Sequence, residues 1–149
     1  MKILFLLSLS LNTLATTVSV TNICEESLFM QEKIHTTIGL GTVSDYTLHA
    51  FQKSSIDFKG DEIAITSILN TQTGLDAYEV ISDNEMKAYG WCFEVDGKQP
   101  NLFMNQIKID PTQNSHINWF YGYAHYLNGE WITYCSPSNA ERSAFVCKD

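Results

Sequence analysis

The stretch that decides the fold is Tyr89-Gly90-Trp91-Cys92-Phe93-Glu94-Val95-Asp96-Gly97. Its large apolar residues occupy every second position from Trp91 to Val95, and small or polar residues stand between them. A period of two predicts a strand with one apolar face. Asp96-Gly97 predicts a tight hairpin turn, since both residues tolerate positive φ. We expect 117–121 and 18–20 to supply neighbouring strands.

One helix is expected, at Val43 to Gln52. Apolar and small residues recur there at helical spacing, which predicts a buried face. Thr42 comes just before this stretch, and Asp45 lies three residues after Thr42, as in a capping box.

Further strands are expected on both sides of this helix. Asn128-Gly129 is the strongest hairpin signal and predicts a return strand after the aromatic stretch 117–127. Short strands are also predicted at 17–23, 28–38, 63–68 and around Ile107 and Ile109, whereas 53–61 and 70–76 read as loop or turn. The layout is α+β: a β-grasp-like mixed sheet with one helix packed on one face, plus a C-terminal β-hairpin extension.

The N-terminus has the pattern of a signal peptide. Met1-Lys2 is basic, 3–11 is apolar, and Thr13-Leu14-Ala15 offers small residues for cleavage after Ala15. A transmembrane anchor is the alternative, but it needs roughly 20 apolar residues. We therefore expect a signal peptide at 1–15, a folded domain at 16–127, a disulfide-bonded extension at 128–149, and a secreted or periplasmic location.

The charge balance limits the partners. The formal net charge is −8, and phosphate contacts need clustered Lys and Arg, so we expect no nucleic acid partner. No other apolar run has the length of a membrane span. A small molecule or a protein remains as the partner.

All four cysteines fall in the mature part, at Cys24, Cys92, Cys135 and Cys147. An even number in an exported chain predicts two disulfides. A zinc site is the alternative, although no close C-x-x-C pair is present. Of the three pairings, we favour Cys135 with Cys147, because it closes a short loop, and Cys24 with Cys92.

No constellation for catalysis emerges from the sequence. No G-x-S-x-G elbow or H-E-x-x-H motif is present. His116 and His125 differ by an odd number, so on one strand they would face opposite ways. We therefore predict no catalytic or metal-binding residues.

The aromatic cluster near the C-terminus is the richest feature. Alternation sends its rings to both faces of a sheet. One interpretation is that one set packs against the helix and the other against the C-terminal extension. The other is an exposed surface that holds a flat ligand or a protein. The candidate ligand-binding residues are Tyr121, Tyr123, Tyr126 and Trp131.

The chain resembles the transcobalamin-like C-terminal domain family at three places. The stretch 90–97 resembles that family's G-W-x-Y-x-V-N-G hairpin, 117–121 its final I-x-W-x-Y strand, and 43–51 its T-V-x-x-A-L helix. Together they cover most of Val18 to Tyr121. The resemblance implies a β-grasp fold and a cobalamin-like corrinoid as ligand, capped on its upper face. The residues alone suggest no cofactor.

Three function classes follow. The favoured one is an exported, non-catalytic binding domain of unknown ligand. The alternatives are an envelope-associated accessory domain without a small-molecule ligand, and a secreted enzyme.

Overall fold

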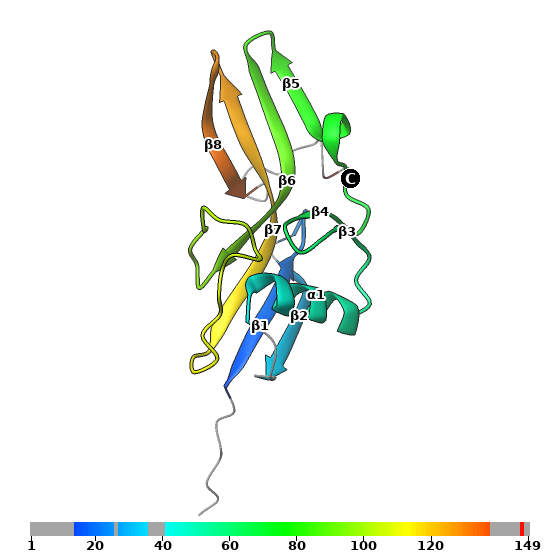
Figure 1. The fold of residues 1–149 in the computed structure, drawn as a ribbon. Helices are drawn as coiled ribbons and strands as arrows, with labels where there is room; N and C mark the ends of the chain where they lie inside the picture. Colours follow the sequence, from blue (N-terminus) through cyan, green and yellow to red (C-terminus); the bar gives the residue numbers. More distant parts are fainter. Residues whose placement is uncertain (1–13, 26, 36–40, 138–146, 148–149) are drawn as a thin grey trace, which may run out of the picture.

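The computed structural model describes residues 14–25, 27–35, 41–137 and 147. Over these residues the chain forms a mixed α+β fold with one α-helix and a strongly curled mixed sheet (Figure 1). The elements are β1 (Ala15–Thr21), β2 (Leu28–His35), α1 (Val43–Lys53), β3 (Phe58–Gly60), β4 (Ile65–Ile68), a 3-10 helix η1 (Gly74–Ala77), β5 (Tyr78–Ser82), β6 (Glu85–Val95), β7 (Ser115–Leu127) and β8 (Glu130–Pro137).

The two long strands β6 and β7 form the spine of the molecule. They pair antiparallel over the whole length of β6, from Glu85↔Leu127 to Val95↔Ile117. The main sheet has the order β2-β1-β7-β6-β5, and β8 pairs with the distal half of β7. β3 and β4 form a separate ribbon.

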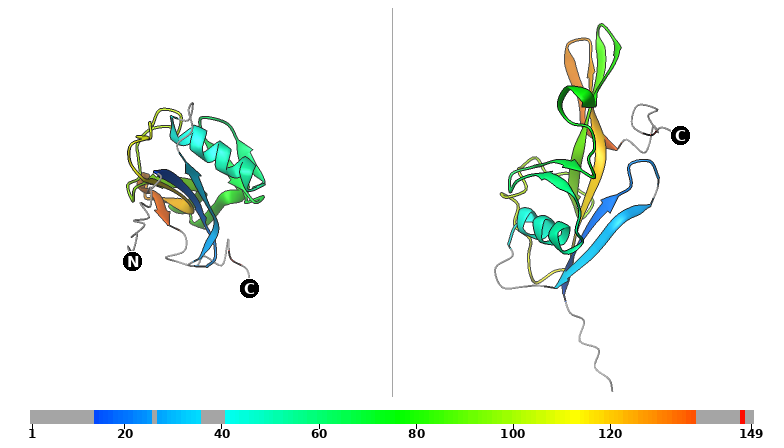
Figure 2. Two further views of the ribbon diagram at one scale, coloured as in Figure 1. Left: turned by 90° about the horizontal axis from the view of Figure 1, so that it is seen from below. Right: turned by 90° about the vertical axis from the view of Figure 1, so that its right-hand side faces the viewer.

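These pairings divide the molecule into a body and an arm. In the body, β1 runs parallel to β7, from Thr16↔Ser115 to Val20↔Trp119, and β2 lies outside β1. In the arm, β5 and β8 flank the distal halves of β6 and β7. Figure 2 shows the arm extending well beyond the helix-covered body.

α1 closes the core of the body. The capping box is confirmed: the Thr42 side chain accepts from the backbone N–H of Asp45, and the Asp45 side chain accepts from the backbone N–H of Thr42. Phe51 is fully buried and packs 6.2 Å from the ring of Trp119. Trp119 also donates its indole N–H to Thr47 Oγ1 at 3.1 Å. The helix thus covers the sheet face formed by the odd-numbered residues of β7.

Both predicted hairpin turns are confirmed, because their residues adopt the positive φ that such turns require. Asn128 and Gly129 have φ of 52° and 96°, and Asp96 and Gly97 have φ of 51° and 75°. The strand expected around Ile107 and Ile109 is absent from the described structure, because this segment meets the helix start in one isolated bridge, Thr42↔Lys108. β3 was expected to be loop and β5 was not predicted; both exist through antiparallel pairing.

The predicted disulfide pairing is wrong. The structure joins Cys92 to Cys135 and Cys24 to Cys147. β7 runs outward through the arm and β8 runs back along it. Cys135 therefore comes to the outer side of β6, where Cys92 lies. Gly122 of β7 sits beneath this bond: a Cβ there would lie 3.2 Å from Cys92 Sγ.

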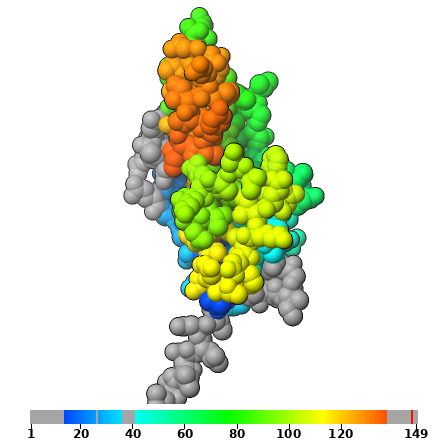
Figure 3. Space-filling model, turned by 60° about the vertical axis from the view of Figure 1, so that its left-hand side comes forward, coloured from blue at the N-terminus to red at the C-terminus, as the bar shows by residue number. Residues whose placement is uncertain are grey.

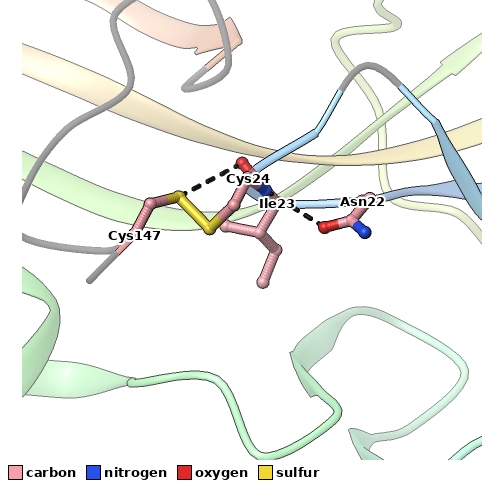
Figure 4. Close-up of a disulfide and its surroundings, with 4 residues drawn as sticks. All are labelled: Asn22, Ile23, Cys24 and Cys147. Atoms are coloured by element: carbon pink, nitrogen blue, oxygen red, sulfur yellow. Dashed lines mark hydrogen bonds between the residues drawn. A yellow bond between two sulfur atoms is a disulfide. The ribbon is translucent and has the colours of Figure 1, made fainter. Parts of the chain in front are cut away.

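The second disulfide fastens Cys147 to the turn after β1 (Figure 4). The sulfur of Cys147 lies 3.7 Å from the carbonyl oxygen of Ile23, and the Asn22 side chain accepts from the backbone N–H of Cys24. With both bonds formed, no free cysteine remains in the described chain.

The expected signal peptide lies mostly outside the described residues, which begin at Leu14. Ala15 is the first residue of β1 and pairs with His35. None of the helices in the described part of the chain has the length and hydropathy needed to cross a membrane.

Candidate functional site

The arm presents two chemically different faces. We call the face that continues the helix-covered side the inner face, and the opposite one the outer face. β6 and β7 pair without a bulge, so alternation assigns Lys87 and Tyr123 to the inner face and Met86 and Tyr126 to the outer face.

The inner face is a packed aromatic cluster. Tyr121 is 4% exposed, and its ring stacks on Tyr89 at 6.1 Å and meets the edge of Trp91 at 5.4 Å. Tyr123 packs 5.8 Å from Tyr89 and carries Lys87 Nζ 4.7 Å from its ring centre. These rings hold the arm to the body and leave little free aromatic surface.

The polar tips of this cluster are engaged. The Tyr89 hydroxyl donates to Glu79 at 2.7 Å, and the Tyr121 hydroxyl donates to the carbonyl of Gln72 at 3.3 Å. Burial raises the pKa of Tyr121. Further out, His125 lies 3.0 Å from Glu85 across the two strands. The Tyr89 and Tyr121 hydroxyls and His125 therefore all have partners, whereas the buried Thr133 Oγ1 has none among the described residues.

In the part of the chain that the structure describes, the outer face of the arm is uncharged and exposed. Trp131 pairs with Tyr126, and their rings meet edge to face at 5.4 Å. Trp131 is 38% exposed, and Val80 of β5 is 74% exposed. The register places the following described residues on this face, none of them charged: Tyr78, Val80, Met86, Ala88, Ala124, Tyr126 and Trp131.

The four candidate binding residues do not form one surface. Tyr121 and Tyr123 lie on the inner face, and Tyr126 and Trp131 lie on the outer face. Tyr121 is buried, so the prediction that it is an accessible anchor is wrong; its ring is core because Tyr89 and Trp91 pack on it. A binding role for Tyr126 and Trp131 stays a prediction.

The sequence reasoning missed the contribution of β5. Tyr78 and Val80 join the outer face because they pair with Ala88 and Met86 of β6. The signal was present in the sequence, as apolar Tyr78 and Val80 alternate with Glu79. The stretch is too short to predict a strand without knowledge of its partner.

A polar cluster occupies the outer face of the body. Ser19 Oγ lies 2.7 Å from His116 Nε2 and donates to Asn118 Oδ1 at 2.8 Å. Asn118 in turn donates to Glu94 at 3.1 Å. A Ser–His contact can indicate a nucleophile and its base. Ser19 is 0% exposed, however, so its hydroxyl cannot reach a substrate.

The histidines are dispersed: His35, His116 and His125 lie on strands, and His49 lies on α1. The described residues contain no group of three or more His, Cys, Asp or Glu side chains placed to share a metal ion. The odd spacing of His116 and His125 does send them to opposite faces: His116 contacts Ser19 on the outer face, and His125 contacts Glu85 on the inner face.

No protein-family model matches the chain, and no curated protein matches it. A solved structure described as "a putative metal binding protein from Ruminococcus gnavus ATCC 29149" is distantly similar. The sequences are 16% identical, the TM-score is 0.39, and the match covers 74% of this chain and 99% of that chain.

Proposed function

We propose that this chain is a non-catalytic binding domain that contacts a protein partner through the outer face of the arm. The observation that carries the proposal is the contrast between the two arm faces. Charged groups on the inner face are paired, whereas the outer face leaves Val80 74% exposed and Trp131 38% exposed, with no charged residue among those described on that face. Contiguous apolar patches of this kind mark interaction sites.

The shape of this face favours a protein over a small ligand. Small-molecule sites are concave and cover most of their ligand, whereas the arm offers strand surface that projects away from the body (Figure 1). Trp and Tyr are also the residues most enriched at the energetic centre of protein interfaces. Tyr126 and Trp131, held edge to face, supply such a centre without further ordering.

We also propose that the domain is exported by the signal peptide at 1–15. Two disulfides indicate an oxidising compartment, and the basic start followed by an apolar run supports secretion or periplasmic delivery.

For the architecture, we propose a β-grasp of the transcobalamin-like type, elaborated by the arm. The parallel pair β1–β7 inside the sheet and the helix packed over it support this assignment. The resemblance makes a cobalamin-like corrinoid the second candidate ligand, since flat ligands stack on exposed rings.

The test uses a photo-crosslinking amino acid placed at Val80 of the full chain, in the cells that produce it. A second protein carries the same amino acid at the exposed Gln113, outside the arm. We expect a discrete adduct from position 80 only, and its loss in a Trp131→Ser variant whose thermal midpoint is unchanged.

Equal adducts from both positions, or none from position 80, would argue against the arm as the contact surface and favour the accessory role. Quenching of Trp131 fluorescence by cyanocobalamin would instead support the corrinoid as ligand.

A further inference from the structure

A second recognition feature lies on the body side of the arm, at the edge of β6 that faces away from β7. The backbone N–H of Val95 donates to Lys98 at 2.9 Å, and the backbone N–H of Lys98 donates back at 3.0 Å. The main-chain N–H and C=O groups of Val95 therefore point away from β7. Because main-chain direction alternates along a strand, the N–H and C=O groups of Phe93 and Trp91 point to the same edge.

This edge is open between two closed ends. β5 pairs with β6 only over Glu85–Ala88, and the hairpin turn closes the other end at Val95. Between them, no described residue hydrogen-bonds the main-chain groups of Trp91 or Phe93 on this edge. A strand edge with free donors and acceptors is a template for another strand.

The edge is rigid, because both side chains are anchored on the inner side. Trp91 donates its indole N–H to Thr71 Oγ1 at 2.7 Å, and the Phe93 ring packs 5.1 Å from Trp119. An added strand would therefore meet a preorganised surface and pay little for ordering it.

A hollow of about 370 Å³ accompanies this edge. Its far wall is fixed by the Cys92–Cys135 disulfide and by Gln99, which donates to the carbonyl of Cys135 at 3.0 Å. Figure 3 shows the end of β8 directly above the segment that follows Lys98. The described residues that line it are all uncharged: Trp91, Cys92, Phe93, Gln99, Pro100, Asn101, Tyr134 and Cys135.

We infer that the β6 edge at Trp91 and Phe93 binds an extended, uncharged peptide segment as an additional strand. The peptide would exchange main-chain hydrogen bonds with Trp91 and Phe93, whose repeat of roughly 7 Å is that of alternate strand residues. Its alternate side chains enter the hollow, beside Tyr134, which is 72% exposed. The uncharged lining favours Thr, Val or aromatic residues over charged ones.

The open length sets the size of the ligand. Four residues from Trp91 to Glu94 lie before the closed end at Val95, which is about 13 Å of strand. A hexapeptide covers this length with one residue to spare at each end. This inference is independent of the protein contact proposed for the outer face, which involves other residues.

The experiment measures amide hydrogen exchange by NMR on the full chain. In the free protein, the amides of Trp91 and Phe93 should exchange at least tenfold faster than those of Cys92 and Glu94, which face β7. Protection of Trp91 and Phe93 equal to that of their neighbours would overturn the inference, because the edge would already be paired.

The second part of the experiment uses a library of uncharged hexapeptides of alternating Thr, Val and Tyr. We expect a member that binds below 1 mM, slows exchange at Trp91 and Phe93 at least tenfold, and weakens severalfold with Tyr134→Ala. The same peptide with every backbone nitrogen methylated keeps its side chains and should not bind. Equal binding of the methylated form, or no binder below 1 mM, would contradict strand addition.

Discussion

Gly90 and Gly122 face each other across β6 and β7, yet their surroundings differ. A Cβ on Gly122 would lie 2.8 Å from the carbonyl oxygen of Ser136 and 3.2 Å from Cys92 Sγ, whereas a Cβ on Gly90 would meet nothing within 4 Å. Only at Gly122 does the fold require a residue without a side chain, because the Cys92–Cys135 disulfide and the end of β8 pass over it.

This difference gives a matched pair of variants. Gly122→Ala should lower the free energy of unfolding by about 1–3 kcal/mol through overpacking. Gly90→Ala should leave it unchanged or raise it by up to about 1 kcal/mol, since alanine restricts the unfolded chain. Urea denaturation measures both. Equal changes in the free energy of unfolding would show that the disulfide does not restrict the space at Gly122.

Tyr46 and Thr47 offer a second pair within α1. Both are fully buried, but the Tyr46 hydroxyl has no hydrogen-bond partner among the described residues, whereas Thr47 accepts from Trp119. Tyr46→Phe should therefore raise the free energy of unfolding by about 1 kcal/mol. Thr47→Val should lower it by about 1–3 kcal/mol, because the indole N–H of Trp119 loses its acceptor. A destabilising Tyr46→Phe would reveal an unseen partner for the hydroxyl.

At the scale of elements, α1 shows what local sequence can decide. Thr42 and Asp45 fix the start of the helix by hydrogen bonds three residues apart, and the apolar spacing fixes the face that is buried. The Asn128-Gly129 turn is equally local. β5 is different, because Tyr78–Ser82 becomes a strand only by pairing with β6. The face reached by Trp131 also depends on a register shift in β8.

The cap predicts a pH dependence. The Thr42 hydroxyl, together with the N–H groups of Thr42 and Gly41, lowers the pKa of Asp45 below its ordinary value of 3.8. Because the pKa is lower in the folded state, the stabilisation by ionised Asp45 is fully present above the pKa of the unfolded state. It is lost as the pH falls through the pKa of the folded state.

Asp45→Ala should thus cost about 1 kcal/mol at pH 7. The difference in free energy of unfolding between this variant and the natural chain should shrink as the pH falls below about 4. Urea denaturation at pH 7 and at pH 3 measures this, with Glu62→Ala, at an exposed carboxylate, as control. A cost that stays constant down to pH 3 would show that the charge of Asp45 plays no part.

At the scale of the whole molecule, the disulfides follow from topology. The sequence indicated that all four cysteines pair, but the partners depend on β8 returning along β7, which brings Cys135 to Cys92. The burial of Tyr121 was hidden for the same reason, since Tyr89 and Trp91 reach it through β6. Long-range pairing was the information that the sequence patterns lacked.

Replacing Cys92 and Cys135 together by alanine should lower the free energy of unfolding by about 4 kcal/mol, since the bond closes a loop with a sequence separation of 43. Urea denaturation measures the loss, and the Cys24→Ala/Cys147→Ala protein is the matched comparison. Peptide mapping without reduction should join Cys92 to Cys135. A peptide that joins Cys135 to Cys147 would contradict the structure.

The Cys24–Cys147 bond spans a sequence separation of 123 residues. The chain between these two cysteines is therefore a covalent ring, and one cut by a protease anywhere inside it opens the ring without releasing a fragment. Exposed loops are the usual places of such nicks. Both halves would stay joined after a first cleavage, which adds only one water to the mass, and they would separate only when the disulfides that join them are reduced.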